Sequence, residues 1–198
     1  MVLEDRRTAF QRLYLLAESQ GGYFGAGQAI SCGYGYRLHN FHVHRGSWIR
    51  VARGVFRLRA FPTGNWEDLI RMWFWSLRRG VVSHESALAF HRLGDVLPDQ
   101  IHLTVPPGFR KRDEAVALHH GDIPAVDVEN HPGFRVTTPV RSLLDCAQGA
   151  LPQEQLNAAI RDAIRGGVPR WRLGERGTAL TERGRRRLDA ALQAPATA

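Results

Sequence analysis

The side chains of this chain with the clearest chemical potential are the cations and amides between positions 36 and 57. A guanidinium group binds phosphate or the edge of guanine, and an asparagine amide matches the edge of adenine in the major groove. This combination of residue types indicates contact with DNA. The candidate DNA-binding residues are Tyr36, Arg37, His39, Asn40, His44, Arg45, Arg50, Arg53 and Arg57.

The distribution of charge favours a polyanionic partner. Of the net charge of +8, residues 1–62 contribute +6, from nine arginines and three acidic residues, whereas residues 63–198 contribute +2. An excess of cations confined to the first third of a chain is typical of a nucleic-acid-binding domain.

Two patterns predict the elements that present these side chains. Residues 35–45 follow a glycine-containing turn and have the composition of a recognition helix in a helix-turn-helix. Residues 48–58 form a two-strand pattern with Arg53 and Gly54 at the hairpin tip, as expected for a wing. We therefore predict a winged helix-turn-helix DNA-binding domain over residues 1–62.

The predicted recognition helix has two large apolar residues three positions apart, Leu38 and Phe41, which we expect to face the core. Tyr36, Asn40 and Val43 then point away from the core. His42 lies beside the apolar face and is predicted to pack inside the domain.

Residues 63–198 alternate helix and strand patterns, which predicts a mixed α/β domain and an α/β fold class for the whole chain. A basic segment over 181–188 is expected to form the C-terminal helix. The other predicted elements are helices over 65–79, 83–91 and 153–165, a helix that begins at Pro139, and strands over 81–82, 101–105, 115–119, 126–129 and 134–136.

The absence of a suitably placed lysine argues against a nuclease interpretation of this second region. A restriction-type core needs carboxylates on adjacent strands and a lysine beside them. Asp122, Asp127 and Glu129 supply acids, but the residue two positions after Glu129 is His131. We expect no enzyme activity of this kind.

Other chemically suggestive patterns are also incomplete. Ser83-His84-Glu85 lacks the Gly-x-Ser-x-Gly context of a hydrolase, and Ser83 is predicted to cap a helix. The pair His119-His120 faces opposite sides of a strand, and the histidines of the recognition helix lack a metal-binding spacing. We expect no catalytic residues, no metal and no cofactor.

The sequence contains no pattern that predicts export or membrane insertion. Charged residues follow Met1-Val2-Leu3 at once, so no signal-peptide apolar region is present, and the uncharged stretch 19–36 holds six glycines. Cys32 and Cys146 form no CxxC pair and are expected to be reduced, buried thiols. We therefore expect a cytoplasmic protein without a membrane partner.

A series of short motifs runs through both regions in a fixed order and spacing. In the first region they are Gly21-Gly22-Tyr23-Phe24, Gln28-Ala29, Gly33-Tyr34, Tyr36-Arg37-Leu38, His42-Val43, Trp48-Ile49-Arg50-Val51 and Arg53-Gly54-Val55-Phe56-Arg57-Leu58. In the second region they include Val82-Ser83-His84-Glu85-Ser86-Ala87-Leu88, Ile101-His102-Leu103-Thr104-Val105-Pro106 and Val136-Thr137-Thr138-Pro139. Over roughly residues 8–168 the chain resembles the AbiEi-type antitoxins.

This resemblance implies an antitoxin of a type IV toxin–antitoxin system, whose functional partner is a nucleotidyltransferase toxin encoded beside it. It also implies repression of its own operon through inverted repeats in operator DNA, with residues 63–198 as the antitoxin domain. Gly35 stands where the family has a serine that caps the recognition helix, and His44 and Arg45 also depart from the family pattern. These differences concern which operator sequence would be recognised, more than DNA binding itself.

Two alternatives stay open. One is a stand-alone winged-helix transcriptional regulator without a toxin partner, and the other is a nucleic-acid-processing enzyme. The neighbouring gene distinguishes the first alternative from an antitoxin, and the missing lysine argues against the second. We expect antitoxin activity to reside mainly in the nearly neutral region 63–198.

Overall fold

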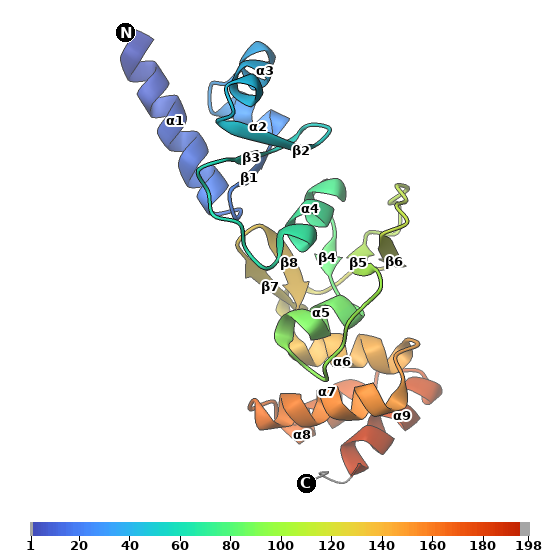
Figure 1. Cartoon of the computed structure of the whole chain (residues 1–198). Coiled ribbons are helices and arrows are strands. Elements are labelled where there is room, and N and C mark those ends of the chain that lie inside the picture. Colours follow the sequence, from blue (N-terminus) through green and yellow to red (C-terminus); the bar gives the residue numbers. More distant parts are fainter. Residues whose placement is uncertain (1, 195–198) are drawn as a thin grey trace. The chain divides into compact units, whose positions relative to one another are not determined.

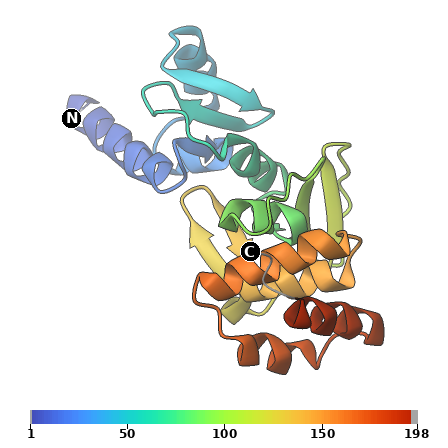
Figure 2. The ribbon, with the colours of Figure 1, turned by 60° about the horizontal axis from the view of Figure 1, so that its bottom comes forward.

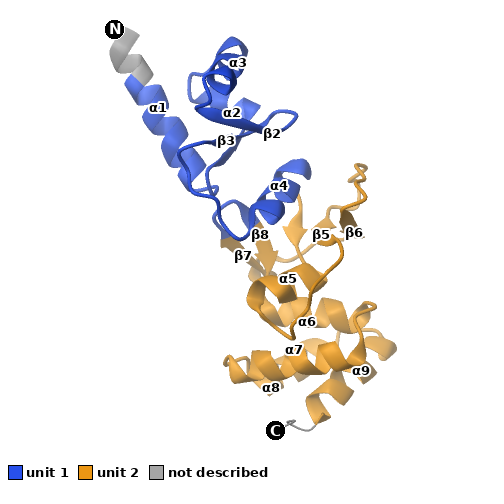
Figure 3. Cartoon of the chain, viewed as in Figure 1, with its two compact units in different colours: residues 1–78, 131–134 blue, residues 79–130, 135–198 orange. Residues whose placement is uncertain are grey.

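The computed structural model describes residues 2–194, with side chains from Arg7 onward. The chain is mixed α/β and divides into two compact units (Figure 3). Unit 1 runs to Arg78 and also contains residues 131–134. Unit 2 contains Arg79–Asn130 and the residues from Arg135 onward.

Unit 1 has the order of elements predicted for a winged helix-turn-helix (Figure 1). Its first elements are α1 (Val2–Glu18), β1 (Tyr23–Gly25), α2 (Ala26–Ser31), α3 (Tyr36–His44), β2 (Trp48–Ala52) and β3 (Val55–Leu58). The strands form an antiparallel sheet of order β1-β3-β2, and α3 packs against β2. The helix predicted over residues 35–45 and the two-strand pattern predicted over residues 48–58 are present as α3 and the β2–β3 hairpin, which we call the wing.

Glycines make the two sharp turns of this unit. Gly22 has a φ of 90° and donates its N–H to the Ala17 carbonyl, which ends α1. Gly54, at the tip of the wing, has a φ of 73°. Both lie in the left-handed region that side chains other than glycine rarely adopt.

Trp48 is central to the core of unit 1. Its ring meets Phe24 edge-on, with centroids 4.8 Å apart, and also packs beside Phe56 and Tyr34. The buried residues of this core are Leu13, Ala17, Phe24, Ala29, Cys32, Tyr34, Trp48, Phe56 and Leu58. Aromatic packing of this kind fixes α3 relative to the wing.

Unit 1 continues past the predicted boundary at residue 62, because helix α4 (Glu67–Trp75) belongs to it. Phe74 stacks on Tyr23 with ring centroids 6.3 Å apart, and Glu67 pairs with Arg57 at 3.7 Å. These contacts between α4 and the sheet make α4 part of unit 1, which runs to Arg78.

Unit 2 contains most of a five-stranded sheet of order β6-β5-β4-β8-β7. Strands β5 and β6 are parallel, as are β4 and β8, whereas β4 and β5 are antiparallel. The elements are β4 (Val81–Val82), α5 (His84–His91), β5 (Ile101–Val105), β6 (Val116–His120), η1 (Ala125–Asp127), β7 (Val128–His131), β8 (Phe134–Thr137), α6 (Pro139–Gln148), α7 (Gln153–Arg165), α8 (Arg170–Gly177) and α9 (Glu182–Gln193).

The helices of unit 2 form one packed group (Figures 1 and 2). Helix α5 contacts β5 and α6, and α9 contacts α6, α7 and α8. Thr138 caps α6 by accepting a hydrogen bond from the Arg141 N–H at 3.3 Å, with Pro139 in the first turn as predicted. Within the described residues, no helix combines the length and the apolar character needed to cross a bilayer.

Candidate nucleic-acid interface

One side of α3 presents polar residues to solvent. Arg37, Asn40 and His44 recur at the spacing of one helix face and are all exposed, and Tyr36 is 72% exposed beside them. Gly35 precedes the helix with extended backbone and offers no side-chain cap. The predicted outward direction of Tyr36 and Asn40 is therefore confirmed, whereas that of Val43 is wrong, because Val43 packs against the core of unit 1.

The wing adds cations next to this helix face. Arg50 on β2 donates a hydrogen bond from Nη2 to the Asn40 Oδ1 at 2.7 Å. The Arg50 guanidinium also lies 5.5 Å from the centroid of the Phe56 ring. Arg53 is exposed at the tip of the wing. The structure thus brings side chains of α3 and β2 into one surface, which we call the α3–wing surface (Tyr36, Arg37, Asn40, His44, Arg50 and Arg53).

His39 does not belong to this surface, so its predicted contact with DNA is wrong. Its side chain is 3% exposed, and Nε2 lies 2.8 Å from the Tyr34 carbonyl oxygen. The ring also packs against Trp48 and Phe56. A buried carbonyl needs a partner, and His39 supplies it.

The two large apolar residues of α3 that were predicted to face the core do not do so. Leu38 and Phe41 are 42% and 49% exposed, so the expectation that they face the core is wrong. His42 instead packs inward, stacked on Trp48 with centroids 4.8 Å apart, as predicted for this residue. Burial, with Arg45 nearby, lowers the pKa of His42 and favours its neutral form.

Leu38 and Phe41 line an apolar groove between α1 and α3 that the sequence did not predict. Phe10 and Tyr14 of α1 are also exposed there. Arg45 lies at this groove, with its guanidinium 5.6 Å from the Phe41 ring centroid. Arg45 is therefore exposed, but it is placed beside the groove and outside the α3–wing surface.

Arg57 is a structural residue, and the prediction that it contacts DNA is wrong. Its side chain is 11% exposed and pairs with Glu67 at 3.7 Å. Its Nη1 also donates a hydrogen bond to the Phe61 carbonyl at 2.9 Å. These contacts use the guanidinium to connect β3 with the segment that leads into α4.

Unit 2 contains a cluster of three half-buried histidines. The rings of His84 and His119 stack with centroids 3.5 Å apart, and His119 Nε2 lies 3.2 Å from His102 Nδ1. His102 Nε2 in turn lies 3.9 Å from a carboxylate oxygen of Glu85. Burial, with repulsion from the neighbouring rings, lowers the pKa of His84 to about 3 and that of His119 to about 4. Both rings are therefore neutral at neutral pH.

Ser83 precedes α5 as predicted, but its hydroxyl does not cap the helix. Its Oγ accepts a hydrogen bond from Thr104 Oγ1 at 2.8 Å and lies 3.0 Å from His84 Nδ1. Instead of capping α5, the Ser83 hydroxyl interacts with Thr104 on β5 and with His84 of the histidine cluster.

The acids considered for a nuclease core have separate surroundings. Asp127 is buried, and its two oxygens accept hydrogen bonds from Arg176 Nη2 at 2.8 and 2.6 Å, with Arg141 at 3.7 Å. Glu129 is exposed on β7, and Asp122 lies in the loop after β6. Among the residues that the structure describes, no group of three or more histidine, cysteine or acidic side chains has an arrangement that could hold a metal ion.

The fold resembles that of a solved mycobacterial protein. The chain is similar to the crystal structure of the RV2827C protein from Mycobacterium tuberculosis, with a TM-score of 0.55 and 14% sequence identity. The similarity covers 93% of this chain and 76% of that chain. At this identity the comparison concerns the fold alone. No model of a known protein family matches the chain, and no curated protein sequence matches it either.

Proposed function

We propose that this chain binds operator DNA through the α3–wing surface and represses its own operon as the antitoxin of a type IV toxin–antitoxin system. The observation that carries the DNA-binding part is the exposed set of Arg37, Asn40 and His44 on α3, joined to the wing by Arg50. A helix of these dimensions enters the major groove, where arginine and asparagine read base edges.

The wing supports the proposed DNA binding as well. A hairpin that carries Arg53 at its exposed tip is suited to the phosphate backbone or the minor groove. The concentration of positive charge in residues 1–62 adds long-range attraction to DNA.

The antitoxin part of the proposal rests on the motif resemblance, which extends through residues 8–168 and so includes most of unit 2. The functional partner would be a nucleotidyltransferase toxin, neutralised either by direct contact or indirectly. Unit 2 would carry this activity, because the excess charge that suits DNA lies in unit 1.

One experiment separates the two activities in the full-length chain. The variant with both Arg37→Ala and Arg53→Ala is compared with the wild type for binding to its own upstream DNA and for rescue of growth when the neighbouring toxin gene is co-expressed. We expect loss of DNA binding with rescue retained. Loss of both activities in a folded variant would contradict the division of labour, and DNA binding without rescue in the wild type would indicate a stand-alone regulator.

A further inference from the structure

A pocket of about 360 Å³ lies in unit 2 where β5 and β6 end. Pro106 directly follows β5 and Gly121 directly follows β6, and both line the pocket. Because the two strands are parallel, their carboxyl ends meet at the same edge of the sheet. In open α/β sheets, ligands bind outside the carboxyl ends of strands, and this volume is within the range of small-molecule sites.

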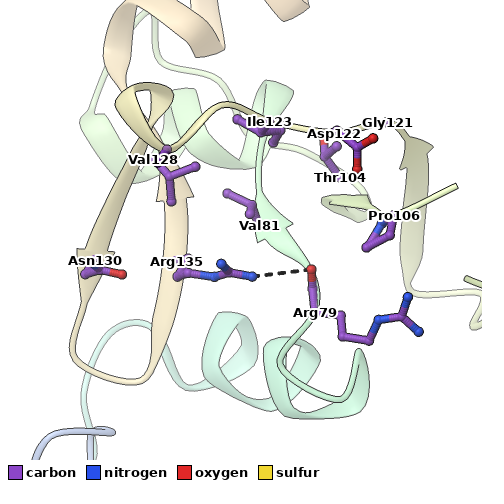
Figure 4. Close-up of a pocket in the computed structure, with 11 residues that line it drawn as sticks. Arg79, Val81, Thr104, Pro106, Gly121, Asp122, Ile123, Val128, Asn130 and Arg135 are labelled. Atoms are coloured by element: carbon purple, nitrogen blue, oxygen red, sulfur yellow. Dashed lines mark hydrogen bonds between the residues drawn. The ribbon is translucent and has the colours of Figure 1, made fainter.

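The topology brings two arginines to this edge. Strand β4 is antiparallel to β5 and parallel to β8, so the amino ends of β4 and β8 reach the carboxyl end of β5. Arg79 precedes β4, and Arg135 lies near the start of β8. Figure 4 shows Arg135 extending toward the Arg79 backbone, where its Nη2 donates a hydrogen bond of 3.4 Å to the Arg79 carbonyl oxygen, whereas the Arg79 side chain extends away from Arg135. Guanidinium groups are the preferred protein ligands of phosphate.

The rest of the lining suits a ligand with hydroxyl groups and an apolar ring. Val81 lies between Arg135 on one side and Asp122 and Ile123 on the other (Figure 4). The Asp122 carboxylate can accept hydrogen bonds from ribose hydroxyls, and the aliphatic side chains of Val81 and Ile123 can contact a base. Two guanidinium groups and one carboxylate leave the lining with a net positive charge.

The loop between β5 and β6 adds to this field. Arg110, Lys111 and Arg112 are exposed in it, and Phe109 lies beneath the Arg79 guanidinium at 6.0 Å from ring centroid to Cζ. These three cations line a separate pocket, so what they contribute is long-range attraction of anionic ligands.

We propose that this pocket binds a mononucleotide, with its phosphate held by Arg135 and by the exposed Arg79 side chain, which would turn from Phe109 toward the phosphate, and with its ribose hydroxyls facing Asp122. The site uses no residue of the α3–wing surface, so it stands apart from the proposed DNA binding and goes beyond it.

Isothermal titration of the full-length chain tests this proposal. The ligands are the four ribonucleoside monophosphates, the matching nucleosides and inorganic phosphate. We expect at least one monophosphate to bind, with its nucleoside and inorganic phosphate each weaker by about tenfold or more. Absence of binding by every monophosphate would overturn the proposal, as would equal affinity for the nucleoside or for inorganic phosphate.

Variants then locate the bound nucleotide. Arg135→Gln and Arg79→Gln should each weaken it by about tenfold or more, and Arg135→Lys by less, since the charge is kept. Because Arg135 is half-buried, circular dichroism is used to check that the Arg135→Gln variant folds. If it does not fold, the Arg79→Gln variant decides the test, because Arg79 is exposed. Arg172→Gln, an exposed arginine of α8, is the matched control and should bind as the wild type does.

A further control experiment distinguishes nucleotide binding in this pocket from binding at the α3–wing surface. The variant with Arg37→Ala and Arg53→Ala should keep its affinity for the mononucleotide. If that variant lost nucleotide binding, or if Arg79→Gln bound like the wild type, the assignment to the pocket would be wrong. Operator binding by Arg79→Gln is measured in parallel, so failure of the pocket is distinguishable from failure of the DNA-binding proposal.

Discussion

Asn40 on α3 and Arg50 on β2 are joined by a hydrogen bond of 2.7 Å from the Arg50 Nη2 to the Asn40 Oδ1. The bond crosses from the helix to the wing on an exposed surface. In the proposed DNA complex, a bond that already orients the Asn40 amide in the free protein would reduce the side-chain entropy lost on binding.

This contact predicts that the two residues act together. Asn40→Ala and Arg50→Ala are made singly and together, and operator affinity is measured by fluorescence anisotropy. We expect a coupling free energy of about 0.5–3 kcal/mol, as found for residues in direct contact. The pair Asn40 and Arg53 serves as the control cycle. Additive losses for Asn40 and Arg50 would show that the bond does not orient the amide for binding.

Arg37 and Arg53 are predicted to have different roles. Arg37→Ala should cost about 1–3 kcal/mol with operator DNA and much less with unrelated DNA, because Arg37 lies on the exposed face of α3. Arg53→Ala should weaken both DNAs alike and reduce the salt slope by about 1. Titrations of both variants against both DNAs check this, and equal proportional losses for the two variants would contradict the assignment.

His39 is predicted to affect stability. His39→Ala removes the partner of the Tyr34 carbonyl and should lower the free energy of unfolding by about 1–3 kcal/mol from that loss alone. His44→Ala, on the exposed face of the same helix, should change stability by less than about 0.5 kcal/mol. Urea unfolding of both variants gives the comparison. A His39→Ala variant of normal stability but with weakened DNA binding would restore the direct-contact interpretation.

The histidine cluster of unit 2 predicts a loss of stability in acid. The folded pKa of His84, about 3, lies below its ordinary value of 6.5, so the unfolded chain binds more protons between these values. The stabilisation is complete above about pH 6.5 and falls as pH decreases toward the folded pKa, by about 1.4 kcal/mol per pH unit for His84. His119 and His102 act in the same direction.

Urea unfolding at several pH values between 7.5 and 5 measures this slope. His84→Asn should flatten it, and asparagine also tolerates the φ of 50° at this position. His44→Gln, at an exposed position of α3 in unit 1, should leave the slope unchanged. A His84→Asn slope equal to that of the wild type would show that His84 does not contribute.

Local signals in the sequence were sufficient to predict α3 and the wing. The glycine-containing turn before α3 and the Arg53-Gly54 tip are short-range features, and both elements formed where predicted. The face of α3 was not predictable in the same way, because it depends on tertiary packing. Leu38 and Phe41 are the more apolar residues, but Trp48 makes aromatic contacts with His39 and His42 instead.

Long-range partners explain the other differences. Arg57 lies in the predicted wing, and this position indicates a DNA contact, but its partner Glu67 lies beyond the predicted domain boundary at residue 62. Helix α8 was not predicted, since Gly174 and Gly177 lower its helix propensity. It is held by Arg176, which pairs with the buried Asp127, and by Leu173, which is fully buried. None of these partners can be identified from spacing along the sequence.

The salt dependence of operator binding tests the central claim most directly. The three exposed arginines of the α3–wing surface (Arg37, Arg50 and Arg53) predict a slope of about −3 for the logarithm of affinity against the logarithm of salt concentration. The measurement is a fluorescence anisotropy titration of the full-length chain with its own upstream DNA at increasing KCl. We predict tight binding at low salt, that slope, and a preference for this DNA over a scrambled sequence. Absence of binding at low salt, or a slope near zero, would contradict the account.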